Sequence, residues 1–277
     1  MGMRRPHRNP PKEIKGNKEK SEAMRKPIEI STGTEDDHIS ALLSPPTEIR
    51  PDQTDLPLVV MAHHFPGTKE SHDDLFGDLE FLFNTSGLPS LRFDFRGCGQ
   101  SSGRQEHFTL ARAREDFDLV LHWAKKKGYK NIILVGEGLG ARLALEKTGD
   151  NTMMLLLFWP LIDLPDYAKR HFDTENLFKT DGSADFIMID RNKIGMHMIG
   201  EMLDSPPFVF PKLEIPVLIQ HGAQDTVVPV EQLDLLKGME ARRLDITTYQ
   251  DGGHGLPDPR HRKMIFFHIG QFLEKYT

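Results

Sequence analysis

The stretch Asn131-Ile-Ile-Leu-Val-Gly-Glu-Gly-Leu-Gly140 carries most of the information about the fold. It begins with the apolar run Asn131–Val135, which is typical of a strand buried on both faces of a parallel sheet. Glycines follow at 136, 138 and 140, and the apolar, alanine-rich segment Leu139–Lys147 is expected to be a helix. The stretch therefore predicts a strand, a sharp turn and a helix, the repeating unit of α/β proteins.

Similar units lie on both sides of this stretch. Further buried strands are predicted at Leu58–Ala62, Ser90–Phe95, Met153–Trp159 and Pro216–Ile219, and edge strands at Pro27–Ser31 and His38–Leu43. Helical patterns occupy Asp73–Asn84, Phe108–Lys127, Val230–Gly238 and Pro259–Lys275. This alternation predicts an α/β fold with a mostly parallel sheet and right-handed crossovers.

Two segments fall outside the alternation. Residues 163–213 contain no clear strand and many aromatic and methionine side chains, so we expect a helical cap inserted over the carboxyl edge of the sheet. Residues 1–26 contain nine Lys/Arg and three Glu and show no periodicity, which predicts a basic disordered tail. The remainder, residues 27–277, is expected to form one domain that includes the cap.

Composition excludes several classes of protein. The whole chain of 277 residues has a formal net charge of −6, and the part after residue 26 carries 26 Lys/Arg against 38 Asp/Glu, a net of −12. An acidic body argues against a nucleic-acid partner. We find no apolar run long enough to span a membrane and no secretory signal, so a cytoplasmic protein is expected. One cysteine excludes a disulfide framework and a Cys-rich zinc site, and we expect neither a metal nor a cofactor.

Five short motifs occur in an informative order. His63-His64-Phe65-Pro66-Gly67 follows a predicted strand, and Asp94-Phe-Arg-Gly-Cys-Gly-Gln-Ser101 begins at the end of the next. Gly138 lies in the sharp turn, and Asp225 and His254 each come just after a strand. This order resembles the α/β-hydrolase superfamily over about residues 28–277. The greatest similarity is to bacterial carboxylesterases and to acyl-peptidases of the serine-aminopeptidase type.

The resemblance implies a three-layer fold, with helices on both faces of the sheet, and a role for each motif. The turn corresponds to the nucleophile elbow Gly-x-Ser-x-Gly, in which the serine attacks an acyl carbonyl. Gly138 occupies the serine position and has no side chain with which to attack. His254 matches the general base, Asp225 the carboxylate that orients it, and the backbone N–H groups of Phe65 and Leu139 the oxyanion hole.

Neither Glu137 nor Cys98 is expected to replace the missing serine. Glu137 precedes the turn, but in the family this side chain points back into the fold, and Cys98 is expected to be a small filler of a glycine turn. His64 replaces a family glycine, so the oxyanion hole is expected to be narrowed or reshaped. His63, His64 and His72 lack the carboxylate spacing of a metal site.

Two further patterns are given a structural interpretation. Asp94 and Arg96 are expected to lock their loop, and Glu115, Asp116 and Asp118 are expected to form a solvated helix face. The glycines at 136, 138 and 140 do not have the spacing G-x-G-x-x-G, which argues against a dinucleotide site.

Three functional hypotheses follow. In the first, the protein has lost serine catalysis and binds a small acyl or aryl ligand, or a protein partner. In the second, it hydrolyses esters or thioesters with water activated by His254 and Asp225, or with another nucleophile. In the third, it is an engineered Ser-to-Gly form of a serine esterase.

Overall fold

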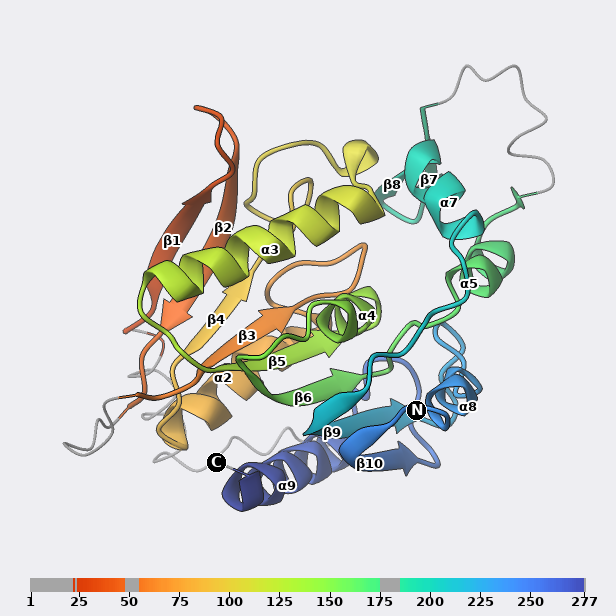
Figure 1. Ribbon diagram of the computed structural model, residues 1–277. Helices are drawn as coiled ribbons and strands as arrows, with labels where there is room; N and C mark the ends of the chain where they lie inside the picture. The colour runs from red at the N-terminus through yellow and green to blue at the C-terminus, as the bar shows by residue number, and fades with distance from the viewer. Residues whose placement is uncertain (1–21, 23, 48–54, 175–184, 277) are drawn as a thin grey trace, which may run out of the picture.

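The computed structural model describes residues 22, 24–47, 55–174 and 185–276. Within them, an eight-stranded sheet runs in the order β1-β2-β4-β3-β5-β6-β9-β10 (Figure 1). The strands are β1 (Lys26–Ser31), β2 (His38–Ser44), β3 (Leu58–Ala62), β4 (Ser90–Phe93), β5 (Ile132–Glu137), β6 (Thr152–Phe158), β9 (Leu213–Gly222) and β10 (Ala241–Tyr249). β2 pairs antiparallel with β1 and β4, and the remaining pairs are parallel.

The centre of the sheet is buried on both sides. Every residue of β3 and of β5 is buried, as the continuous apolar runs predict. β5 pairs with β3 on one side and β6 on the other, so that Gly136 lies opposite Ala62. The carboxyl ends of these strands therefore lie together at one edge of the sheet, where the loops that follow them can build a common site.

Helices cover both faces of the sheet. α3 (Leu110–Lys126) and α4 (Leu139–Glu146) lie on one face, and α2 (Leu75–Thr85) and α9 (Pro259–Tyr276), which contact each other, lie on the other (Figure 1). The short α8 (Gln232–Leu236) follows β9. The Thr109 side chain caps α3 by accepting the Arg112 N–H, and two lysines in the last turn suit the helix dipole. The three-layer, mostly parallel α/β architecture expected from the sequence is confirmed.

The insertion at 163–213 differs from its prediction. It contains α5 (Leu164–His171) and α7 (Met196–Leu203), but also a two-stranded antiparallel hairpin of β7 (Phe186–Ile189) and β8 (Asn192–Gly195). The expectation that the insertion has no strand was therefore wrong. Each strand has only four residues, too few for an alternating pattern to be recognised. α5 and α7 pack against each other.

At its beginning, the domain starts one residue earlier than predicted, because β1 includes Lys26. The predicted disordered tail falls almost entirely on residues 1–21 and 23, outside the described residues. No helix in the described part of the chain is both long enough and apolar enough to cross a membrane.

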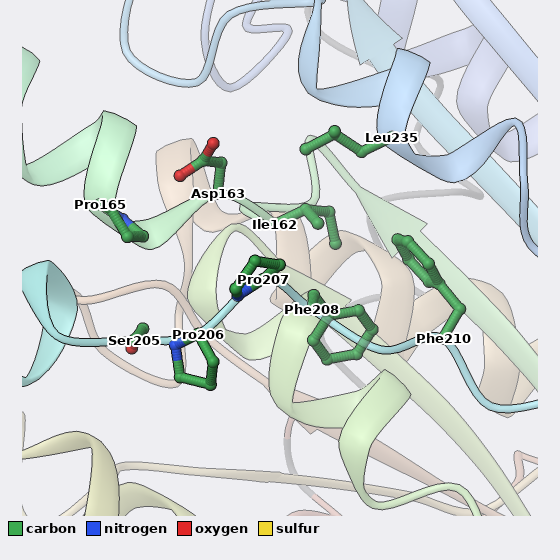
Figure 2. A pocket seen from close by; sticks show the side chains of 9 residues that line it. All are labelled: Ile162, Asp163, Pro165, Ser205, Pro206, Pro207, Phe208, Phe210 and Leu235. Carbon is green, nitrogen blue, oxygen red and sulfur yellow. The ribbon is translucent and has the colours of Figure 1, made fainter.

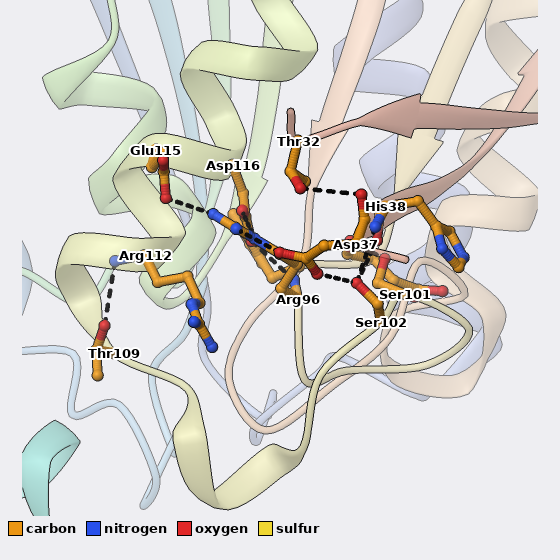
Figure 3. A network of polar contacts seen from close by, with 12 residues as sticks. Thr32, Asp37, His38, Arg96, Ser101, Ser102, Thr109, Arg112, Glu115 and Asp116 are labelled. Carbon is orange, nitrogen blue, oxygen red and sulfur yellow. Dashed lines mark hydrogen bonds and ion pairs between the residues drawn. The ribbon is translucent and has the colours of Figure 1, made fainter. Parts of the chain in front are cut away.

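One polar network locks the loop after β4. The Arg96 guanidinium binds Asp116 and Glu115 of α3, each at 2.5 Å, and Asp37, at 2.9 Å, between β1 and β2 (Figure 3). The loop-locking role expected of Arg96 agrees with this geometry. Asp116, however, is completely buried, so its assignment to a solvated face was wrong. The residue pattern of α3 alone does not show that the Arg96 guanidinium, from the loop after β4, reaches the Asp116 carboxylate.

Candidate active site

Gly138 forms the turn between β5 and α4. Its backbone angles are φ 51° and ψ −114°, which a residue with a Cβ adopts only with strain. Hydrogen bonds fix this peptide from both sides: its N–H donates to the Phe158 carbonyl and its own carbonyl accepts from Leu161 N–H, both at 3.0 Å. At Gly140 a Cβ would lie 2.6 Å from the Ala62 carbonyl carbon, so glycine lets α4 approach β3. The backbone thus has the sharp strand–turn–helix form of a nucleophile elbow.

The imidazole of His64 fills the space beside Gly138. A Cβ placed on Gly138 would lie 2.7 Å from His64 Cγ and 3.1 Å from Cε1, and closer still to Nδ1. Real Cβ atoms essentially never approach another heavy atom within 3.0 Å. A serine at position 138 is therefore incompatible with the present position of His64.

His64 also engages one of the two N–H groups that are expected to form the oxyanion hole. The backbone N–H of Leu139 donates to His64 Nδ1 at 3.0 Å. Nδ1 is thus the acceptor nitrogen, and in the neutral ring the proton lies on Nε2, 3.5 Å from the Tyr167 hydroxyl oxygen. The N–H of Phe65, the second expected donor, has no acceptor among the described residues. On the Leu139 side, the predicted oxyanion hole is therefore occupied by the His64 side chain.

His254 and Asp225 form a hydrogen-bonded pair. Nδ1 of His254 lies 2.9 Å and 3.1 Å from the two carboxylate oxygens of Asp225. The Asp225 side chain is fully buried, and its Oδ1 also accepts the N–H groups of Val227 and Val228 at 2.9 and 2.8 Å. These three donors hold the carboxylate in place, so it fixes the orientation of the imidazole. The ring of His254 lies 6.2 Å, between centroids, from that of His64.

A cavity of about 440 Å³ opens beside this pair. Its polar lining residues include His64, His72, Glu137, Tyr167, His171 and His254, which we call the polar wall. Its apolar lining residues from the insertion include Phe172, Ile189, Ile194, Met198 and Met202, which we call the apolar wall. The lining thus combines hydrogen-bonding groups with apolar side chains, as small-molecule sites commonly do.

Burial controls the charge of the polar wall. Desolvation lowers the pKa of His64 well below its usual value, and the nearby His254 lowers it further. Desolvation likewise lowers the pKa of His72. Burial raises the pKa of Glu137 and that of Tyr167, the latter to about 12. At neutral pH, His64 is therefore an uncharged imidazole.

Known structures share this architecture. The esterase Est1E from Butyrivibrio proteoclasticus, solved with ferulic acid bound, aligns with a TM-score of 0.73 over 90% of this chain and 98% of its own, at 22% identity. Mouse alpha/beta hydrolase domain-containing protein 10 aligns with a TM-score of 0.71 over 91% and 100%, at 18% identity. The chain is an α/β-hydrolase-fold protein.

Sequence comparison relates this α/β-hydrolase-fold protein to acyl transferases. A family model described as acyl transferase matches residues 34–164. An acyl transferase of Vibrio campbellii is 30% identical over 115 residues, which are 41% of this chain and 36% of that protein. Another, from Shewanella hanedai, is 21% identical over 195 residues, 66% of this chain and 63% of that protein. The matched region thus spans less than two thirds of either relative.

The residues singled out in the sequence meet in the α/β-hydrolase-fold site. Gly138 and Leu139 contact the His64 ring, Phe65 lines the same cavity, and His254 pairs with Asp225. Their catalytic roles stay predictions. Cys98 is buried, and burial raises the pKa of its thiol, which disfavours the thiolate.

Glu137 and His63 hold the loop after β3. Glu137 is 3% exposed, borders the cavity, and accepts the backbone N–H of His64 at 3.2 Å. His63 is fully buried, with Nε2 accepting the Phe95 N–H at 3.1 Å. Among the described residues, no group of three or more His, Cys, Asp or Glu is placed so that it could hold a metal ion.

Sequence reasoning missed Tyr167 and His171 of α5. Their rings lie 4.3 Å apart between centroids, and both line the cavity. They stand four positions apart and so share one helix face, but the sequence alone does not show that this face turns toward His254.

A second cavity of about 290 Å³ lies away from the pair, between the start of α5, α8 and the segment after α7 (Figure 2). Figure 2 shows the side chains of Phe208, Phe210 and Leu235 around it, with Asp163 at its edge. Asp163 is already used as the N-cap of α5, accepting the Asp166 N–H at 2.9 Å. This cavity contains none of the residues of the candidate active site.

Proposed function

We propose that this protein binds a small acyl or aryl ligand in the 440 Å³ cavity and does not act as a serine hydrolase. The observation that carries the proposal is the position of His64, whose ring fills the space of a nucleophile at 138 and accepts the Leu139 N–H. Loss of the triad serine costs about 10⁶ in turnover, so an elbow that also excludes a serine is not that of a working serine hydrolase.

The apolar wall and the relatives support an acyl or aryl ligand. Methionine and isoleucine side chains of the insertion line the cavity that His254 also borders. The relatives from Vibrio campbellii and Shewanella hanedai are acyl transferases, and the Est1E structure has ferulic acid bound. A ligand with an apolar body and one polar end fits both walls of the cavity.

The test combines changes at positions 64 and 138. Because the His64 ring excludes a Cβ at 138, Gly138→Ser alone is expected to show no labelling by a fluorophosphonate probe. Gly138→Ser with His64→Gly provides both the hydroxyl and the space for it, and frees the Leu139 N–H. This double variant is expected to label and to hydrolyse p-nitrophenyl butyrate at least about a hundredfold faster than the parent, a small part of what a triad serine contributes.

The matched control pairs Gly138→Ser with His122→Gly, a change at an exposed position on α3. It should behave like Gly138→Ser alone. Strong labelling of the Gly138→Ser single variant would overturn the proposal and favour the engineered Ser-to-Gly hypothesis. Labelling of the unmodified chain would show that another residue serves as nucleophile.

One observation favours a second candidate, hydrolysis by activated water. Nδ1 of His254 binds Asp225, and the ring borders the cavity, as a general base for water requires. General-base catalysis contributes about 10²–10⁴. If this candidate is correct, purified protein hydrolyses p-nitrophenyl esters and His254→Ala removes that activity. If the parent protein and His254→Ala hydrolyse the esters at the same rate at every pH, hydrolysis by activated water is ruled out.

A further inference from the structure

The polar wall contains more imidazole groups than an acyl site needs. His64, His72, His171 and His254 all border the same cavity. The ring of His254 is 5.4 Å from that of His72 and 6.2 Å from that of His64. Tyr167 joins the group, with its ring 6.1 Å from that of His64. Four imidazoles, each able to accept a proton, thus line a single cavity.

The rings of His64 and His254 each have a nitrogen available to a ligand. Since His64 Nδ1 accepts the Leu139 N–H, its Nε2–H is a donor, and its contact of 3.5 Å with Tyr167 is at the limit of a hydrogen bond. His254 uses Nδ1 for Asp225, and its Nε2 has no partner among the described residues. The cavity therefore presents a hydrogen-bond donor and a basic nitrogen.

The carboxylates around the cavity are engaged or peripheral. Asp225 accepts hydrogen bonds from His254 and two backbone N–H groups, and Glu137 accepts the backbone N–H of His64. Asp190 lines the cavity from an exposed turn between β7 and β8. A cation also lies nearby, because Arg262 Nη2 donates to the His72 carbonyl at 2.8 Å. Beyond these groups, the charge facing the cavity is set by the histidines.

We propose that the cavity selects the ionised carboxylate of a small monocarboxylic acid, an inference that rests on the proposed ligand-binding function. The carboxylate accepts the Nε2–H of His64 and the Tyr167 hydroxyl. His254 takes one proton from solvent at Nε2, so that its imidazolium lies between Asp225 and the ligand. The apolar body of the acid packs against Met198, Met202 and the other side chains of the insertion.

An ester is expected to bind to the polar wall less tightly than a carboxylate does. Its carbonyl carries no charge to stabilise an imidazolium, and the Leu139 N–H that would bind it is occupied by His64. Burial lowers the pKa of His64 and of His72, and the nearby His254 lowers both further. A protonated imidazole repels a positive charge on its neighbours. The negative charge of a bound carboxylate offsets this repulsion and therefore favours proton uptake on binding. Binding of a carboxylate should therefore weaken as the pH rises.

Isothermal calorimetry with octanoate, octanamide and methyl octanoate tests the proposal. The three compounds share an alkyl chain, and only octanoate is charged between pH 6 and pH 8. At pH 6 octanoate is expected to bind at least about tenfold more tightly than octanamide. This ratio should decrease by at most about tenfold per pH unit, the limit for one proton. Measurements in buffers of different ionisation enthalpy should show uptake of protons with octanoate only.

The variant His254→Gln keeps a polar side chain but cannot take up the proton. It should lose the proton uptake and most of the preference for octanoate over octanamide. His122→Gln removes an exposed imidazole from α3 and should behave like the parent. If His254→Gln still takes up a proton when octanoate binds, the assignment of that proton to His254 is overturned.

The outcomes separate the two proposals. Equal binding of octanoate and octanamide, without proton uptake, overturns carboxylate selection and leaves the acyl-binding function standing. Failure of all three compounds to bind, in a protein that remains folded, overturns both.

Discussion

Residues 64 and 138 are sterically coupled across the site. The glycine makes room for the imidazole. The imidazole occupies the space that a serine side chain at 138 would take, and it accepts the Leu139 N–H that would bind a substrate oxyanion. Changes at two such positions are not additive, because each alters what the other can do. The local chemistry is therefore a property of the pair, and a glycine in the elbow considered alone does not describe it.

This coupling predicts the stability of Gly138→Ser. The left-handed φ of 51° costs a serine about 1–3 kcal/mol, and overlap with His64 adds to that cost. Urea denaturation should show a lower free energy of unfolding than the parent, with part of the loss recovered when His64→Gly is added. Gly270→Ser, where a Cβ meets nothing within 4 Å, is the control and should stay within about 0.5 kcal/mol. A Gly138→Ser variant more stable than the parent would contradict the strain argument.

Among the elements, the insertion both forms the apolar wall and supports the main domain. Glu201 of α7 accepts the backbone N–H of Leu110, the first residue of α3, at 2.5 Å. A carboxylate at a helix N-terminus satisfies a free N–H and favours the helix dipole. The hydrogen bond therefore couples the position of α7, and of the cavity residues Met198 and Met202, to the start of α3.

Removing that carboxylate tests the coupling. Glu201→Ala should lower the free energy of unfolding by about 1 kcal/mol, as loss of a helix cap does, and Glu201→Gln, which keeps an acceptor, should lower it less. Urea denaturation gives the values, and hydrogen exchange at the Leu110 amide locates the effect. Glu214→Ala, at an exposed carboxylate that forms an ion pair with Lys212, serves as the control. Equal effects of Glu201→Ala and Glu214→Ala would mean that the hydrogen bond does not contribute.

At the scale of the whole molecule, histidines whose pKa is lowered in the folded state make stability depend on pH. Burial lowers the pKa of His63, His64, His72 and His221 in the folded state. The unfolded chain binds protons at these positions more readily, so stability decreases as the pH falls through about 6.5, the unfolded value. Glu137 and Asp116, whose pKa values burial raises, act in the opposite direction and offset part of the loss.

We expect the free energy of unfolding to fall by about 1–3 kcal/mol between pH 7 and pH 6, before the carboxyl groups dominate. Urea denaturation at half-unit intervals of pH measures this directly. A stability that stays constant or increases over that interval would show that these imidazoles titrate normally in the folded protein.

The sequence predicted the central architecture because β3, β5 and α4 are locally consistent. Their buried runs and the glycine turn all favour one structure. The β7–β8 hairpin was missed because each of its strands has only four residues. At the site, Gly138, His254 and Asp225 could be located by motif order. The position of the His64 ring could not, since it depends on a side-chain direction set by contacts more than seventy positions away.

The overlap between His64 and a side chain at 138 also bears on how the protein can change over generations. A single substitution to serine places a hydroxyl where it does not fit, and a single substitution of His64 opens space with nothing to attack from it. Neither step alone provides a hydroxyl with space around it, so selection for a serine nucleophile at this position has no improved intermediate to retain. The arrangement therefore makes the gain of such a nucleophile depend on two substitutions that occur together.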